Sequence, residues 1–281
     1  MNRVMTDEAK EMTIDELCGR LATLGRRHNH GYFHYTKWES FSKMQAVNND
    51  ELGNERRFLK LSSKNVLNDA FEKRMEDGTF VFCFSIGEEE CIAQWKIYGA
   101  DQEDAVRLKF RQSALSRWLR SFDKGAIKVY VKQDEQYLPI ERKCRARLID
   151  VAYPSSNENR NLRMISVGNE KVHMVEGWKD KIMQKKYAPF FKKQGWSYER
   201  EVRLVIDKTG LDVDYIYVPF DDPFKSLIDD FKNGKCPIMR GPWFNEKSGK
   251  RLVSVRGIEL ARALKSDYEG EIRKTNKEEG K

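Results

Sequence analysis

The chain has 281 residues, of which 40% are hydrophobic and 34% charged, which is typical of a folded protein with much solvated surface rather than a disordered chain. Its net charge of +8 indicates an anionic partner such as nucleic acid, because lysine and arginine neutralise phosphates, although scattered surface lysine explains the excess equally well. No apolar run approaches the roughly 18 residues of a membrane helix, and the first residues lack the apolar segment of a secretory signal, so we expect a cytoplasmic protein without a membrane partner.

The first half of the chain alternates between predicted helices and strands. Thr13 and Glu16 have the spacing of a capping box, which predicts an amphipathic helix over about 13–26. Alternating aromatic and β-branched segments predict strands, and apolar residues at helical spacing predict helices. The predicted strands are 31–36, 57–63, 79–85 and 104–110, and the predicted helices are 37–44, 88–99 and 113–122.

The second half is predicted to be richer in strands. We expect strands at 126–131, 145–153, 201–206 and 214–220, and a largely helical segment over 170–194 with a break near Pro189. Helices and strands are interspersed without a regular βαβ repeat. The pattern therefore predicts a single α+β domain over 1–265, with a split mixed or antiparallel sheet and flanking helices. The charged tail 266–281 is expected to be flexible.

Few motifs of known chemistry are present. The sequence has no phosphate-binding glycine loop, no nucleophile elbow and no zinc-binding helix motif. The five cysteines are odd in number and form no C-x-x-C pair, so neither a disulfide framework nor a zinc site is indicated. His28 and His30 are conceivable metal ligands, but no carboxylate lies at ligand spacing, so we interpret them as a solvated basic loop and expect no metal.

A pair of glutamates, Glu199 and Glu201, precedes the apolar alternation of the predicted strand 201–206. Residues two apart on a strand face the same side, where like charges repel unless a cation or a reaction uses them. One interpretation is therefore a pair of carboxylates with a chemical role. The alternative is a solvated strand face on which Glu201 pairs with Arg203.

Five stretches, "FHYT", "LKLSSKNVLNDAFE", "FVFCFS", "AQWKIYG" and "GWSYEREVR", occur in this order between residues 31 and 220. Together they resemble a bacterial family of domains of unknown function. One departure is Ala70, where that family usually has proline, while Asn68, Asp69, Phe71 and Glu72 keep the pattern. The family implies no function by itself.

A second resemblance concerns "FHYTKWESFSKM" and "YEREVRLVI", which are similar to the opening and the closing strand of ADP-ribosyltransferases, particularly those that act on nucleic acid. It implies NAD as donor substrate and no metal. Glu201 would stabilise the oxocarbenium-like state formed when the nicotinamide–ribose bond breaks, and Glu199 would orient or deprotonate the acceptor. His34 would bind the adenosine-side ribose, and Tyr35 and Thr36 the nicotinamide amide.

Three further residues complete the predicted NAD site. The superfamily has a central serine or tyrosine near the nicotinamide ribose, for which Ser85 is our choice and Tyr98 the reserve; Asn68 is assigned to the same site. Each has a simpler structural interpretation. Ser85 would cap a turn, Asn68 and Asp69 would form an Asx turn, Trp95 and Tyr98 would be the core face of a helix, and His34 would be a core histidine bonded to a backbone carbonyl.

The resemblance thus implies an NAD-dependent ADP-ribosyltransferase that modifies nucleic acid, with RNA preferred over DNA. Its implied role is that of a toxin or phage-defence effector, with a neutralising antitoxin as a conceivable partner. A noncatalytic module that binds nucleic acid or another partner is the alternative. A third hypothesis is a metal-dependent phosphodiester hydrolase built on Asp69, Glu72, Glu199 and Glu201.

Overall fold

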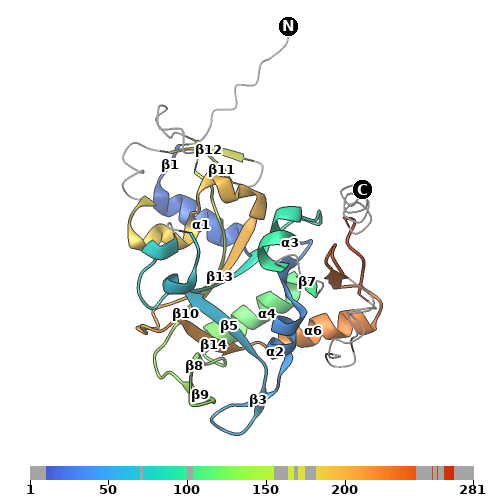
Figure 1. Ribbon diagram of the computed structural model, residues 1–281. Coiled ribbons are helices and arrows are strands. Elements are labelled where there is room, and N and C mark those ends of the chain that lie inside the picture. Colours follow the sequence, from blue (N-terminus) through green and yellow to red (C-terminus); the bar gives the residue numbers. More distant parts are fainter. Residues whose placement is uncertain are drawn as a thin grey trace.

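The computed structural model describes residues 11–69, 72–99, 104–154, 164–167, 170–174, 182–244, 255, 258 and 263–268. Helices and strands alternate along the chain as the sequence predicts (Figure 1). The α-helices are α1 (Ile14–Leu24), α2 (Trp38–Gln45), α3 (Ile92–Gly99), α4 (Gln112–Asp123) and α6 (Asp221–Lys232), and the short 3-10 helices are η1 (Lys64–Val66), η2 (Glu72–Arg74), η3 (Lys185–Phe190) and η4 (Gln194–Glu199).

Most strands form one large sheet. Its members are β2 (Tyr32–Lys37), β5 (Phe58–Ser63), β6 (Phe80–Ser85), β7 (Ala105–Phe110), β8 (Tyr130–Gln133), β9 (Gln136–Pro139), β10 (Arg145–Asp150), β13 (Glu201–Asp207), β14 (Tyr215–Pro219) and β15 (Ile238–Arg240). Two smaller sheets contain β1 (Glu11–Met12), β11 (Met164–Val167) and β12 (Glu170–Met174), and β3 (Asn48–Asn49) with β4 (Glu55–Arg56). Pairings in the large sheet are antiparallel, which confirms the α+β prediction with flanking helices.

The large sheet divides at β6. Strand β13 pairs with one edge of β6 over its whole length, from Glu201 opposite Ser85 to Ile206 opposite Phe80. The other edge of β6 is shared by two strands that pair at opposite ends: β2 pairs where Phe33 lies opposite Ser85, and β5 pairs at Phe80 and Val81. Between these two contacts β2 and β5 diverge. The sheet is therefore split beside residues 82–84 of β6.

The two faces of the sheet pack in different cores because side chains alternate along a strand. On β13, Val202, Leu204 and Ile206 join a large core with α4 and α6, whereas Val205 joins a second core beneath α1 and η3. Arg203 lies between Glu201 and Val205 in this alternation, so the charged residues of β13 belong to the face covered by α1 (Figure 1). That face carries the site described below.

Some predicted elements are wrong. The segment 170–194 is not largely helical: residues 170–174 form strand β12, residues 185–190 and 194–199 form 3-10 helices, and 175–181 lie outside the described residues. The tail does not leave the fold at 266, because Ser266 is buried and its hydroxyl donates to Glu90 at 2.6 Å. Residues 269–281 lie outside the described part. The sequence analysis also missed β9, α6 and β15.

No helix in the described part of the chain is both long and apolar enough to cross a membrane. The five cysteines are free thiols, of which Cys18 is buried, Cys236 is exposed and the other three are half-buried.

The capping box predicted for the first helix is present. The Thr13 backbone N–H and hydroxyl both donate to Glu16 Oε2 at 2.8 Å, and the Thr13 hydroxyl accepts from the Glu16 backbone N–H at 3.3 Å. We expect Thr13→Ala to lower the free energy of unfolding by about 1 kcal/mol, because the first turn of α1 loses its cap. Urea unfolding measures this change. Thr23→Ala, an exposed threonine in the same helix, is the control, and an equal loss in both variants would contradict the capping role.

Candidate functional site

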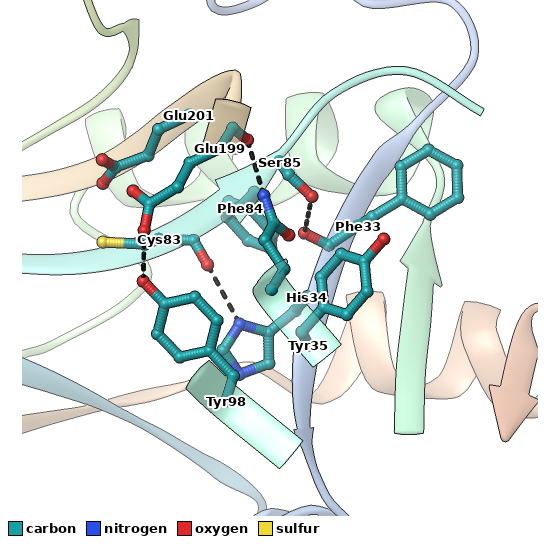
Figure 2. Close-up of a pocket in the computed structure, with 10 residues that line it drawn as sticks. Phe33, His34, Tyr35, Cys83, Phe84, Ser85, Tyr98, Glu199 and Glu201 are labelled. Carbon is teal, nitrogen blue, oxygen red and sulfur yellow. Dashed lines mark hydrogen bonds between the residues drawn. The ribbon is translucent and has the colours of Figure 1, made fainter. Parts of the chain in front are cut away.

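A pocket opens at the split of the sheet, where β6 meets β2 and β13. Its cavity volume is about 50 Å³, and it opens to solvent. Figure 2 shows its walls, which come from β2, β6, α3, η4 and the start of β13. The residues that line it are Phe33, His34, Tyr35, Cys83, Phe84, Ser85, Gln94, Tyr98, Glu199 and Glu201.

The two glutamates do not share a strand face as predicted. Glu199 is the last residue of η4 and Glu201 the first of β13; between them Arg200 adopts a left-handed conformation with φ 46° and ψ 54°. This turn breaks the alternation that a strand would impose. Each glutamate is only 3% exposed, so the alternative of a solvated strand face is also wrong. Both residues nevertheless line the same pocket.

Buried cations hold these carboxylates. Arg203 donates to Glu201 through Nε at 2.7 Å and Nη2 at 3.0 Å, and the same Nη2 contacts Glu72. The Lys192 ammonium lies 2.6 Å from Glu199, 3.4 Å from Glu201 and 3.5 Å from Glu72. We call these five side chains, Glu72, Lys192, Glu199, Glu201 and Arg203, the charge network. All five residues are buried.

The two site carboxylates have opposite tendencies to bind a proton. Burial by itself raises the pKa of Glu201, but the charges of Arg203 and Lys192 outweigh it and lower the pKa to about 2. Burial and the nearby Glu201 charge raise the pKa of Glu199, although Lys192 and the Tyr98 hydroxyl oppose this rise. Two carboxyl groups whose environments separate their pKa values are typical of a division of labour in acid–base chemistry. Glu201 stays ionised, and Glu199 is the one suited to exchange a proton.

His34 enters the split of the sheet with its side chain. Its Nδ1 lies 3.0 Å from the backbone carbonyl of Cys83, and its ring packs 4.3 Å from that of Phe82, measured between centroids. Burial lowers the pKa of His34 to about 4, so the ring is neutral at pH 7. Since Nδ1 donates its proton to the carbonyl, Nε2 of the neutral ring is a hydrogen-bond acceptor. The simpler interpretation, a histidine bonded to a backbone carbonyl, is thus observed, and the same ring also lines the pocket.

The other predicted NAD-site residues fall into two groups. Tyr35, Ser85 and Tyr98 line the pocket, whereas Thr36 is buried outside its lining and Asn68 is exposed and does not line it either. The structure therefore brings together six of the eight predicted residues and leaves out Thr36 and Asn68.

The polar groups of the three lining residues have defined partners. The Tyr35 hydroxyl accepts from the Cys91 backbone N–H at 3.1 Å. The Tyr98 hydroxyl donates to Glu199 Oε1 at 2.8 Å, although the residue as a whole is 36% exposed (Figure 2). The Ser85 hydroxyl is 3.4 Å from the Phe33 carbonyl and does not cap a following turn. Of the suggested helix core face, Trp95 is buried but Tyr98 is not.

Three residues that shape the site, Lys192, Gln94 and Tyr153, were not predicted from the sequence. Lys192 belongs to a pair of lysines that resembles an exposed surface segment. Glu72 was predicted only as a carboxylate of the metal-dependent hydrolase, not as a partner of Arg203. Gln94 of α3 donates to the Glu199 backbone carbonyl at 2.8 Å, and the Tyr153 hydroxyl accepts from the Glu201 N–H at 2.8 Å. Within the charge network, only the pairing of Glu201 with Arg203 was indicated by the sequence.

The described residues contain no group of three histidine, cysteine or acidic side chains arranged to hold a metal. His28 is not a solvated loop residue: its Nε2 lies 2.6 Å from Asp150, and the side chain is 21% exposed. The carboxylates of Glu72, Glu199 and Glu201 contact Lys192, which does not favour a metal-dependent hydrolase.

No family model, no curated protein and no solved structure matches this chain.

The neutral His34 makes stability dependent on pH. Its pKa in the folded state, about 4, is below the usual value of 6.5, so the unfolded chain binds the extra proton first. The contribution of neutral His34 to the free energy of unfolding is therefore fully present above about pH 6.5 and decreases as the pH falls toward 4. We expect the melting temperature of His34→Gln to depend less on pH over this range than that of the wild type, as measured by calorimetry. Parallel pH dependence in the two proteins would contradict this assignment.

Proposed function

We propose that this protein is an NAD-dependent ADP-ribosyltransferase that modifies nucleic acid, with an ADP-ribosyltransferase-like sheet. One observation carries the proposal. Six residues assigned from sequence motifs alone lie around a single pocket at the split of the sheet: His34, Tyr35, Ser85 and Tyr98 of the donor site, and the catalytic Glu199 and Glu201. His34 and Glu201 are 167 positions apart in the sequence. The fold therefore brings these residues together.

The chemistry of the pocket suits transfer from NAD. Cleavage of the nicotinamide–ribose bond develops positive charge on the ribose, which an ionised carboxylate stabilises in a site shielded from water. Glu201 is ionised and buried, and is held in place by Arg203. His34 offers Nε2 as an acceptor for a ribose hydroxyl. The cavity of about 50 Å³ is smaller than a typical small-ligand site, so in our proposal only part of NAD enters the pocket and the rest extends over its mouth.

Glu199 is suited to the acceptor side of the reaction. Its raised pKa and its hydrogen bond with Tyr98 place a proton-exchanging carboxyl at the pocket wall. A carboxylate with a raised pKa is a stronger base, which favours general-base activation of a nucleophile. In this proposal Glu199 orients or deprotonates the acceptor while Glu201 acts on the donor.

Nucleic acid is the proposed acceptor, with RNA preferred over DNA. The net charge is +8, and the segment 183–200, which ends beside the pocket, has four exposed cations, Lys185, Lys186, Lys193 and Arg200. Such side chains exchange counterions for phosphates. The proposed role is that of a cytoplasmic toxin or phage-defence effector, which a partner antitoxin would neutralise.

Incubation with labelled NAD and RNA, DNA or protein tests the activity. We expect label to be transferred to RNA by the wild type and Glu201→Gln to reduce the rate about 10²–10³-fold, because one electrostatic contact in the transition state is lost. Glu72→Gln is the matched control: it removes a carboxylate from the same charge network, but Glu72 does not line the pocket.

Both variants break a buried ion pair with Arg203, so both are expected to be less stable by about 3–5 kcal/mol. A structural role alone would make them equally active when folded. Equal turnover in the two folded variants, measured below their melting temperatures, would end the catalytic assignment of Glu201. Nucleic-acid binding that NAD does not affect, without transfer to any acceptor, would favour the noncatalytic module.

Glu199→Gln should separate donor chemistry from acceptor chemistry. We expect this variant to hydrolyse NAD to ADP-ribose at a rate close to that of the wild type but to transfer ADP-ribose to RNA more slowly, because the base that acts on the acceptor is missing. Chromatography of both products in one reaction measures the ratio. A parallel loss of hydrolysis and transfer would assign Glu199 to the donor instead.

A further inference from the structure

Lys192 is a buried cation at the centre of the site. It lies between η3 and η4 and is 2% exposed. Its backbone N–H donates to the Ala152 carbonyl at 3.1 Å, and its ammonium packs 4.7 Å from the centroid of the Trp196 ring. The main chain therefore fixes where this side chain starts, and its charged end has no access to bulk water.

The ammonium of Lys192 has a different set of contacts from the guanidinium of Arg203. Arg203 reaches Glu201 and Glu72. Lys192 reaches these two and also Glu199, at 2.6 Å. In the described part of the chain, Lys192 is the cation that forms an ion pair with Glu199, and it alone contacts both pocket carboxylates. It thus compensates the repulsion between Glu199 and Glu201.

We propose that Lys192 is the positioning residue of this site: its ammonium group holds Glu199 and Glu201 at the pocket wall and keeps Glu199 available as a base. This inference rests on the proposed function, in which Glu199 acts on the acceptor. Lys192 itself touches neither donor nor acceptor, since it does not line the pocket. It acts through the two carboxylates.

The surroundings of Glu199 make its proton affinity depend on Lys192. Without the ammonium, the carboxyl would keep the Tyr98 hydroxyl but face the ionised Glu201 with no cation of its own, and a carboxyl near a like charge binds its proton more tightly. The titratable and charged groups around the Lys192–Glu199 pair, drawn from every element packed against it, are Glu72 of η2, Cys83 of β6, Tyr98 of α3, Tyr153 after β10, Tyr198 of η4, and Glu201 and Arg203 of β13.

The experiment compares Glu72→Gln with the double variant Lys192→Met/Glu72→Gln. The double variant removes one charge of each sign, so the net charge of the network remains that of the wild type. Carbon-13 NMR of protein labelled at the glutamate carboxyl carbons follows the titration of Glu199, which Glu199→Gln assigns. We expect the midpoint to lie about 1–3 pH units higher in the double variant, the usual effect of an opposite charge within hydrogen-bonding distance.

The activity profile gives a second readout. In the double variant the rate of RNA modification should begin to fall at a pH that is higher by the same amount, because Glu199 must be ionised to act as a base. Lys192→Arg should restore the wild-type midpoint, and Lys193→Met, at the exposed neighbour, should not alter it. A uniform loss of rate at all pH values, with an unchanged Glu199 midpoint, would show a purely structural lysine and overturn the proposal.

The NMR titration needs neither NAD nor turnover. If the wild type transferred no label to any acceptor, the proposed function would fail, while the Glu199 midpoint would still decide whether Lys192 controls this carboxyl.

Discussion

The site depends on the burial of one guanidinium group. Arg203 is 0% exposed in the middle of β13, and a charge in that position must be paired and hydrogen-bonded. Glu201, Glu72 and the Pro189 carbonyl supply its partners, which ties β13 to η2 and η3. Breaking a buried pair costs about 3–5 kcal/mol, against a total stability of about 5–15 kcal/mol for a domain. The position of Glu201 at the pocket is therefore coupled to folding itself, and a carboxylate held this way needs little reorganisation when charge develops nearby.

The split of the sheet also leaves a buried polar group that needs a partner. Where β2 and β5 diverge, residues 82–84 of β6 lose neighbours on one edge, and an unpaired buried carbonyl costs about 1–3 kcal/mol. The Nδ1–H of His34 satisfies the carbonyl of Cys83 in that gap. A structural role and a binding role are consequently not alternatives for this histidine. The hydrogen bond that stabilises the split also fixes the neutral tautomer, which turns an acceptor nitrogen toward the space that the split creates.

Local pattern was sufficient to predict most elements, because capping, strand alternation and helical spacing are short-range properties. The capping box of Thr13, the strands β2, β6 and β13, and the convergence of His34, Ser85 and Glu201 follow from such patterns or from motif resemblance. The helix prediction for 170–194 is wrong because its lysines and aromatics have helical spacing, whereas β12 forms through pairing with β1, which is distant in the sequence, and with β11. Lys192 could not be found, since nothing in its local sequence distinguishes a buried ion pair from a solvated charge. Glu72 was grouped with Glu199 and Glu201 only in the hydrolase hypothesis, and its pairing with Arg203 has no local signal.

The left-handed turn at Arg200 explains why two neighbouring glutamates behave differently. On a continuous strand both carboxylates would share one face and one set of partners. Instead, α3 holds the Glu199 carbonyl through Gln94, and the backbone N–H of Ile86 holds the Arg200 carbonyl at 3.0 Å. Gly87 leaves room for the Arg200 side chain, because a Cβ there would lie 2.6 Å from the guanidinium. Glu201 thus continues into β13 beside Arg203, while Glu199 is turned toward Tyr98 and Lys192. A single backbone conformation gives one carboxylate a cation that keeps it ionised and gives the other an environment in which it can accept a proton.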